Sequence, residues 1–250
     1  MSTGSLAFTA RAMCALGVLV PPLWIRLSFT RGDRDAYRLV QACARRVVAL
    51  AGCSVRVTGL EHLPASGHVM LVANHASMAD AALLLAALPV DFRFVANHVS
   101  AGYPMLGAAI RRASYHIVDR GSWRGRAECA QSMIDALESG QSLLVFPEGR
   151  TGEAGRMLPF RNGAFRAAAR RGTPVVPIVI RGTRDLMAPG RRLLVRAPVD
   201  IDVLRPRVAI DATRASVVAL RDETARAIAD RLAMADRPSR VDRIASVERR

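Results

Sequence analysis

The sequence predicts an α/β protein with a mixed, largely parallel sheet flanked by helices and an N-terminal membrane-associated helical hairpin. Its 250 residues, 51% of them hydrophobic, are enough to bury one sizeable core. From Cys53 onward, short apolar runs of β type alternate with helical patterns. The runs Leu143–Phe146 and Val175–Ile180 lack polar alternation, which is typical of strands covered on both faces. We therefore expect a helical hairpin at residues 1–52, an α/β domain at residues 53–235 and a charged tail at residues 236–250.

The N-terminal segment has the pattern of two helices with apolar and basic side chains. Residues Leu6–Phe29 are strongly apolar, but two arginines and the Pro21–Pro22 pair interrupt them. The uncharged run Ala12–Ile25 has 14 residues, fewer than the roughly 20 that a spanning helix needs. After a polar turn, Ala36–Ala51 forms a second helical pattern. We expect a hairpin dipped into one leaflet at the cytoplasmic face of the inner membrane; a single span and simple packing on the core are the alternatives.

The α/β domain is expected to place its functional residues at the carboxyl ends of its strands. Strands are predicted at Ser54–Thr58, His68–Ala73, Phe92–Ala96, Ser114–Val118, Ser142–Phe146, Val175–Ile180 and Leu193–Ala197. Helices are predicted at Ala79–Leu88, Tyr103–Arg112, Trp123–Ser139, Gly163–Arg171 and Ala215–Ala235.

The charge balance narrows the choice of partner. The net charge is +15, and all 36 basic residues are arginines. Such a charge calls for an anionic counterpart: nucleic acid, anionic lipid or a phosphorylated substrate. The arginines are not interleaved with aromatic residues and no nucleic-acid-binding motif occurs, so we expect an anionic membrane surface and no nucleic acid. The four cysteines lack C-x-x-C spacing, which favours neither disulfides nor a metal site.

The stretch Val69–Asp80 places a histidine where an apolar strand ends and an Ala/Leu-rich helix begins. If the residues after His75 wind tightly, the Asp80 carboxylate can accept a hydrogen bond from the imidazole and fix its tautomer. The spacing therefore predicts a His–Asp pair acting as a general base. The alternative is a structural histidine at a strand end.

Two further strand ends carry polar groups suited to an anion. Arg120 closes one predicted strand and meets a glycine, where its guanidinium could bind a phosphate in a bidentate manner. The stretch Phe146–Gly152 offers a carboxylate, a glycine that exposes backbone N–H groups, an arginine and a hydroxyl. Both stretches are also ordinary turn sequences. No nucleotide-binding or metalloprotease motif is present.

Taken in order, these residues resemble the glycerolipid acyltransferase family. Asn74-His75 with Asp80 is similar to its N-H-x-x-x-x-D motif, and Ile117–Arg120 to its second motif. Phe146–Gly149 matches the third motif and Val176–Val179 the fourth, while the basic stretch at Phe160–Phe165 is also similar. The resemblance covers roughly Val55 to Gly182.

The resemblance implies that His75, oriented by Asp80, removes a proton from the free hydroxyl of a lysophospholipid, most directly 1-acylglycerol-3-phosphate, to give phosphatidic acid. The donor would be acyl-CoA or acyl carrier protein as co-substrate. No cofactor or metal is needed, because a thiolate is a good leaving group. The substrate-binding residues implied are Asn74, Arg120, Glu148, Gly149, Arg150, Thr151 and Pro177.

The chain departs from the family pattern at two positions. The family continues the third motif as Thr-Arg, whereas here the order is Arg150-Thr151, and Asn97 stands where many members carry lysine. A different acceptor, such as a lyso-ornithine lipid, is therefore an alternative. A basic non-enzymatic membrane or nucleic-acid binder is another. A second Asn-His pair at Asn97-His98 has no aspartate at the same spacing, so we do not expect His98 to be the base.

Overall fold

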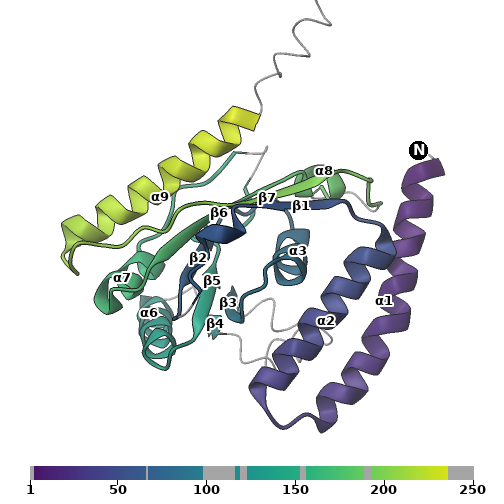
Figure 1. Ribbon diagram of the computed structural model, residues 1–250, viewed down its shortest axis with the longest axis horizontal. Helices are drawn as coiled ribbons and strands as arrows, with labels where there is room; N and C mark the ends of the chain where they lie inside the picture. Colours follow the sequence, from purple (N-terminus) through teal and green to yellow (C-terminus); the bar gives the residue numbers. More distant parts are fainter. Residues whose placement is uncertain are drawn as a thin grey trace, which may run out of the picture.

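The computed structural model describes residues 3–65, 67–97, 116–118, 123–152, 156–188 and 193–235. Within them, a seven-stranded sheet has the order β1-β7-β6-β2-β5-β3-β4 (Figure 1). Its strands are β1 (Val55–Thr58), β2 (Met70–Ala73), β3 (Phe92–Asn97), β4 (His116–Val118), β5 (Ser142–Val145), β6 (Val175–Arg181) and β7 (Val199–Val203). β6 and β7 pair antiparallel, and the other neighbouring strands pair parallel. The predicted mixed, largely parallel sheet is confirmed.

Helices cover both faces of this sheet (Figure 1). On one side lie α1 (Thr3–Phe29), α2 (Asp33–Ala51) and α3 (Ala79–Ala87), and on the other α6 (Trp123–Glu138), α7 (Gly163–Arg171) and α9 (Arg214–Ala235). A 3₁₀ turn, η1 (Leu60–His62), and the short helix α8 (Thr183–Leu186) complete the described elements. Each face packs its own apolar cluster against the sheet.

The central strands form where the sequence is apolar without interruption. All four residues of β2 and of β5 are buried, as expected for strands covered on both faces. Because β2 lies between β5 and β6, the segment that follows it opens in the middle of the sheet's carboxyl edge. The structure thus brings the chain after β2 beside the chains after β5 and β6.

The strand predicted at Leu193–Ala197 is wrong, because the strand lies at Val199–Val203 instead. Two aspartates in that segment obscured its β pattern. One of them, Asp202, is 4% exposed and accepts hydrogen bonds from Thr58, Arg181 and Arg231. A buried carboxylate is tolerated there because cations and a hydroxyl from three other elements surround it.

The hairpin is present, but its first helix differs from the expected one. α1 is one continuous helix that includes Pro21 and Pro22. Phe8 before the prolines and Leu27 after them are both buried, so packing holds the helix on each side of the two missing N–H groups. Gly4–Phe29 is long and apolar enough to cross a membrane by length and composition, and 17% of its most apolar window is buried. This weakly suggests membrane association.

Some predictions fall outside the part of the chain that the structure describes. These are the helix at Tyr103–Arg112, the Asp119-Arg120 strand end and the tail at residues 236–250. The domain boundaries also stay predictions.

Candidate active site at the carboxyl edge of the sheet

The turn between β2 and α3 is held to the neighbouring strand by Asn74. Its Nδ2 donates to the carbonyl of Ile180 in β6, and its Oδ1 accepts from the Ile180 N–H, both at 2.9 Å. Asn74 is 5% exposed, and its amide is satisfied at both ends. It therefore ties the end of β2 to β6, and the substrate contact expected of it stays a prediction.

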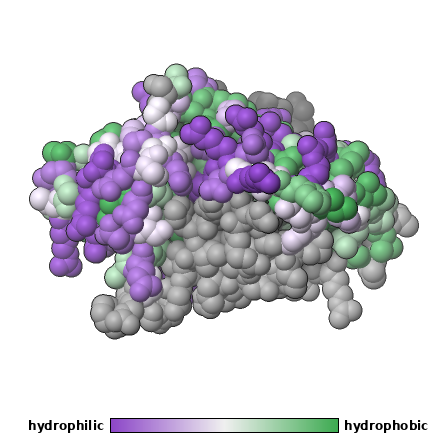
Figure 2. All heavy atoms as spheres, turned by 90° about the horizontal axis from the view of Figure 1, so that it is seen from below, coloured by the Kyte–Doolittle hydropathy of each residue, from purple (hydrophilic) through white to green (hydrophobic). Residues whose placement is uncertain are grey.

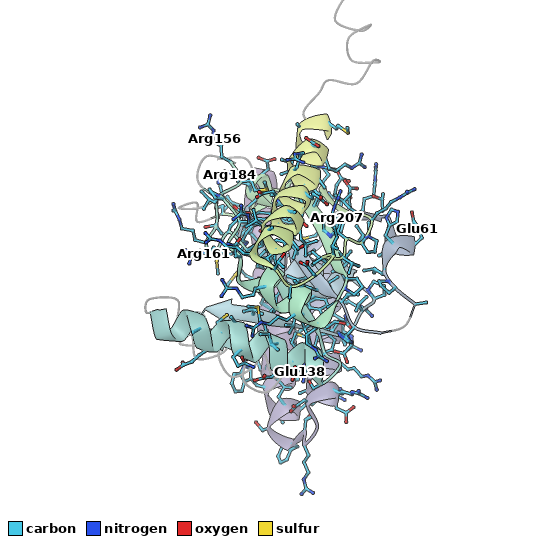
Figure 3. All side chains as sticks on the ribbon, turned by 90° about the vertical axis from the view of Figure 1, so that its left-hand side faces the viewer. Glu61, Glu138, Arg156, Arg161, Arg184 and Arg207 are labelled. Atoms are coloured by element: carbon cyan, nitrogen blue, oxygen red, sulfur yellow. The ribbon has the colours of Figure 1, made fainter. Side chains whose placement is uncertain are left out.

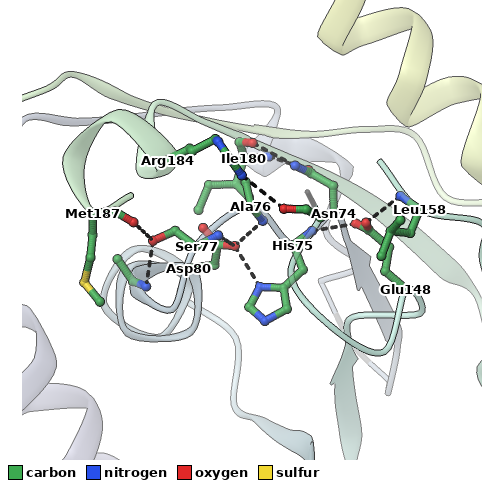
Figure 4. A network of polar contacts seen from close by, with 12 residues as sticks. Asn74, His75, Ala76, Ser77, Asp80, Glu148, Leu158, Ile180, Arg184 and Met187 are labelled. Atoms are coloured by element: carbon green, nitrogen blue, oxygen red, sulfur yellow. Dashed lines mark hydrogen bonds and ion pairs between the residues drawn. The ribbon is translucent and has the colours of Figure 1, made fainter. Parts of the chain in front are cut away.

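Immediately after Asn74, His75 and Asp80 form the predicted pair (Figure 4). The ring Nδ1 lies 2.8 Å from Asp80 Oδ2. The same carboxylate oxygen accepts the backbone N–H groups of Ala76 at 2.7 Å and Ser77 at 2.9 Å. The Asp80 side chain is fully buried, at 0% exposure. Three N–H groups therefore hold Asp80 Oδ2 in place, and this oxygen orients the imidazole ring of His75.

Local sequence explains this geometry. Ser77 and Asp80 have the S-x-x-D spacing of a capping box at the start of α3. The Asp80 carboxylate accepts the Ser77 N–H, and the Ser77 hydroxyl accepts the Ala79 N–H at 3.2 Å. Asp80, in the first turn of α3, thus holds the residues before the helix and orients His75 with one oxygen atom. The turn between the two residues can wind tightly because its free N–H groups have this partner.

Phe146 packs against one face of the His75 imidazole ring. The two rings stack with centroids 4.1 Å apart and planes 17° apart. The His75 side chain is 16% exposed, and its Nε2 lies on the side of the ring away from Asp80 (Figure 4). With Nδ1 bonded to a carboxylate, Nε2 is the nitrogen placed to accept a proton from a bound molecule.

The Glu148 carboxylate accepts hydrogen bonds from two backbone N–H groups. One carboxylate oxygen accepts the His75 N–H and the other accepts the Leu158 N–H, each at 2.7 Å. Burial raises the pKa of Glu148, although these two hydrogen bonds act in the opposite direction. Glu148 is 3% exposed and holds the backbone of the histidine turn in place, and the substrate contact expected of it stays a prediction.

The loop after β5 adds a second backbone tie to the histidine turn. The Gly152 N–H donates to the His75 carbonyl at 2.9 Å. A Cβ at Gly152 would lie 2.3 Å from the Arg156 carbonyl oxygen, so a larger residue there would displace the loop. Gly149 has a φ of +83°, a left-handed conformation that favours glycine. These two glycines let the loop fold closely against His75.

The remaining predicted site residues lie in the loop after β5, inside β6 or outside the described residues. Arg150 is exposed and Thr151 half-buried, both in the loop after β5. Pro177 is buried inside β6, paired with Val72, and therefore lies within the sheet rather than at its edge. Arg120 lies outside the described residues.

A pocket of about 580 Å³ opens beside Phe146. Its apolar wall includes Met133 of α6 and Val145 of β5, while Arg161 and Arg166 supply positive charge. Among the described residues that line it, none is acidic. Figure 3 shows the Arg161 side chain pointing outward from the domain. Phe146 both lines this pocket and stacks on the imidazole, whereas His75 and Asp80 are not among the described residues that line it.

Sequence reasoning missed two residues of the network. The Ser77 hydroxyl donates to the Met187 carbonyl at 2.9 Å, and the capping-box spacing could have identified this serine. Arg184 donates from Nη1 to the Gly152 carbonyl at 3.0 Å. This contact joins the segment after β6 to the loop after β5, and nothing local in the sequence indicates it.

Comparisons with known proteins identify the family of this chain. A family model described as Acyltransferase matches residues 54–181, just over half of the chain. The chain therefore belongs to the acyltransferase family, which confirms the resemblance noted from its motifs.

Two curated relatives are similar over part of their length. The chain is 34% identical over 135 residues to a chloroplastic 1-acyl-sn-glycerol-3-phosphate acyltransferase of Brassica napus, covering 54% of this chain and 39% of the relative. It is 26% identical over 152 residues to the 1-acyl-sn-glycerol-3-phosphate acyltransferase of Borreliella burgdorferi, covering 61% of each chain. The matches thus span less than two thirds of either relative.

A solved structure has the same fold. The crystal structure of the 1-acyl-sn-glycerophosphate (LPA) acyltransferase from Thermotoga maritima matches with a TM-score of 0.75 and 22% identity. The match covers 94% of this chain and 98% of that one.

Proposed function

We propose that this protein transfers a fatty acyl group from acyl-CoA or acyl carrier protein to the free hydroxyl of 1-acylglycerol-3-phosphate, giving phosphatidic acid. The observation that carries the proposal is the 2.8 Å contact between His75 Nδ1 and a fully buried Asp80. This pair is built as a general base, and its family transfers acyl groups. The choice of 1-acylglycerol-3-phosphate as acceptor follows the names of the relatives.

The proposed reaction accounts for each proton and bond. His75 Nε2 takes the hydroxyl proton as the oxygen attacks the thioester carbonyl, and Asp80 stabilises the positive charge that develops on the ring. An O–C bond forms and a tetrahedral oxyanion results. When it collapses, the C–S bond breaks and the proton held on Nε2 passes to the departing thiolate. The reaction needs no metal and no cofactor other than the thioester co-substrate.

The pocket beside Phe146 suits a lipid that carries a phosphate. The pocket beside Phe146 combines apolar walls with Arg161 and Arg166, which fits a phosphate-bearing molecule with an apolar part. We retain Arg120 and Arg150, with Thr151, as the residues that bind the acceptor phosphate.

We propose that the reaction takes place at the cytoplasmic face of the inner membrane, with α1 and α2 at the lipid surface, either lying in one leaflet or spanning once through α1. Large apolar side chains of α1 are exposed: Met13 at 61%, Val18 at 62%, Ile25 at 63% and Phe29 at 82%. Seen from below, the end of the molecule formed by α1 and α2 carries apolar spheres beside hydrophilic ones (Figure 2). Exposed apolar area bordered by arginines is typical of a surface that binds anionic lipid.

A second candidate keeps the chemistry but changes the acceptor. It is favoured by the order Arg150-Thr151, which is reversed from the family pattern and moves the guanidinium one position toward β5. The acceptor would then be another lysolipid, such as a lyso-ornithine lipid.

The experiment offers the purified, detergent-solubilised protein a radiolabelled acyl-CoA or acyl carrier protein together with a panel of lysolipids. Formation of phosphatidic acid from 1-acylglycerol-3-phosphate supports the first candidate. Turnover of another lysolipid, with 1-acylglycerol-3-phosphate left unchanged, supports the second. Acyl transfer to none of the acceptors, together with salt-sensitive binding to vesicles or nucleic acid, would contradict both and favour a non-enzymatic binder.

A further inference from the structure

Side chains of α2 bind the carboxyl end of α3, the helix that carries Asp80. A helix leaves its last four carbonyl groups without partners inside the helix. Three carbonyls at and just beyond the end of α3 each accept a hydrogen bond from α2: Ala86 from Arg45 Nε at 3.0 Å, Leu88 from Gln41 Nε2 at 3.1 Å, and Val90 from the Tyr37 hydroxyl at 3.0 Å. The donors stand four residues apart, so they share one face of α2.

Tyr37 anchors this contact in the protein core. It is 1% exposed, and its ring packs edge-to-face on Phe92 with centroids 6.0 Å apart. The Arg93 guanidinium lies 4.4 Å from the ring centroid. Burial raises the pKa of Tyr37 to about 12, so its hydroxyl stays protonated and able to donate at physiological pH.

The opposite end of α3 holds the reactive pair. α3 has nine residues, so its ends are only about 13 Å apart. Leu83 and Leu84 in its middle are buried against the sheet. A short, packed helix moves as a unit, so a shift at its carboxyl end displaces Asp80 relative to His75. Displacements of about 1 Å in a reacting group can change rates by about a hundredfold.

We propose that Tyr37, Gln41 and Arg45 are positioning residues for acyl transfer. By binding the carboxyl end of α3, they keep Asp80 in line with His75. The hairpin is then part of the scaffold of the active site in addition to its role at the membrane. This inference rests on the proposed function, since it concerns the same His–Asp pair.

The test compares two neighbouring exposed arginines of α2. Arg45→Ala removes one of the three bonds, whereas Arg46→Ala removes the same charge from a residue with no contact to α3 among the described hydrogen bonds. Turnover is measured on detergent-dispersed 1-acylglycerol-3-phosphate, so that affinity for a membrane does not enter. We expect the double variant Gln41→Ala/Arg45→Ala to lose roughly tenfold in kcat with both KM values within about twofold of wild type. Arg46→Ala should match wild type, and Arg45→Lys, which can still donate to Ala86, should recover most of the rate.

A local measurement separates positioning from general loss of stability. Hydrogen exchange at the Ala76 and Ser77 amides, which donate to Asp80, should accelerate in the double variant while the amides of β5 and β6 keep their protection. Tyr37→Phe removes a single hydroxyl and should show the same local effect more weakly.

Three results would overturn the inference. They are an unchanged kcat in the double variant, an equal loss in Arg46→Ala, and a loss confined to KM. If wild-type protein acylates no lysolipid, the proposed function fails, while hydrogen exchange at Ala76 and Ser77 still decides whether α2 controls the geometry of this turn.

Discussion

The turn between β2 and α3 and the hairpin of α1 and α2 use polar and apolar side chains in opposite ways. In the turn, Asn74 and Asp80 are buried and bind backbone groups. In the hairpin, large apolar residues such as Ile25 and Phe29 are exposed. The polar groups of the turn thus find partners within the chain, whereas the hairpin presents exposed apolar side chains.

From this difference we expect the turn to determine the rate of acyl transfer and the exposed face of α1 to determine membrane affinity. The polar contacts of the turn leave one imidazole nitrogen directed away from Asp80, so substitutions there should change turnover. The exposed face of α1 makes no contact with the turn in the described residues, so substitutions there should change membrane affinity alone. The predictions below on the turn and on α1 test the two sides of this division.

The largest effect is expected from Asp80→Asn, which keeps the shape of the side chain but replaces its charge. An amide oxygen in place of Asp80 Oδ2 is a weaker acceptor for the three N–H groups, and an uncharged amide stabilises a positively charged imidazole less well. We expect kcat to fall by about 10³-fold with an unchanged circular dichroism spectrum. A decrease of less than about tenfold would show that Asp80 is only a helix cap.

Glu148→Gln should lower kcat by between about tenfold and a hundredfold, because a carboxamide can accept only one of the two backbone N–H groups from His75 and Leu158. Steady-state kinetics in detergent checks this value. Equal rates for the variant and wild type would separate Glu148 from the position of His75.

The same substitution should also change the pH dependence of stability. Burial raises the pKa of Glu148 in the folded state above that in the unfolded chain. Protonation therefore favours folding, and this contribution is lost as the pH rises through the folded-state pKa. Urea unfolding from about pH 4 to about pH 7 should show the stability of wild type falling relative to Glu148→Gln. A constant difference across this range would contradict the assignment.

Asp202→Ala should affect stability and leave the chemistry intact. Burial acts to raise the pKa of Asp202, but hydrogen bonds from Thr58, Arg231 and Arg181 outweigh it and hold the pKa below its usual value. The resulting stability is present above the unfolded-state pKa and is lost as the pH falls through the folded-state value. We expect the variant to lose about 3 kcal/mol of unfolding free energy at neutral pH and less in acid. Chemical denaturation at both pH values is the measurement, and a loss of equal size in acid would contradict it.

The smallest effect on turnover is expected from Ile25→Ser/Phe29→Ser at the tip of the hairpin. Removing this apolar area should weaken binding to anionic vesicles by roughly tenfold to a hundredfold, at about 25 cal/mol per Å². Turnover of detergent-dispersed substrate should not change. Ile210→Ser is the matched control, since Ile210 is 97% exposed in the loop before α9, and α9 lies on the opposite side of the sheet from α1 and α2 (Figure 1). Equal vesicle binding by both variants would remove the hairpin from the membrane contact.

The sequence predicted the parts of the molecule that depend on local pattern. The apolar strands and the His75–Asp80 contact were predictable, because burial and helix capping act over a few residues. β7 was missed because its aspartates are neutralised by arginines from β6 and α9, which no local pattern contains.

The roles of individual site residues depended on long-range contacts. The Glu148 carboxylate meets the His75 N–H across 73 positions in the chain. Motif matching selected Glu148 and Asn74, and the structure shows their side chains bonded to backbone groups. Their contact with substrate stays a prediction. Pro177 follows the family motif, yet its place inside β6 makes it part of the sheet. Arg184 and the bonds from α2 to α3 had no signal in the sequence.

The central claim is tested most directly by comparing His75→Ala with His98→Ala, since both histidines follow an asparagine and only His75 has an aspartate five positions later. Formation of phosphatidic acid from acyl-CoA and 1-acylglycerol-3-phosphate is measured with purified protein at equal thermal stability. The account predicts that His75→Ala loses at least about 10³-fold in turnover while His98→Ala stays within about twofold of wild type. Near-normal turnover by His75→Ala would contradict it.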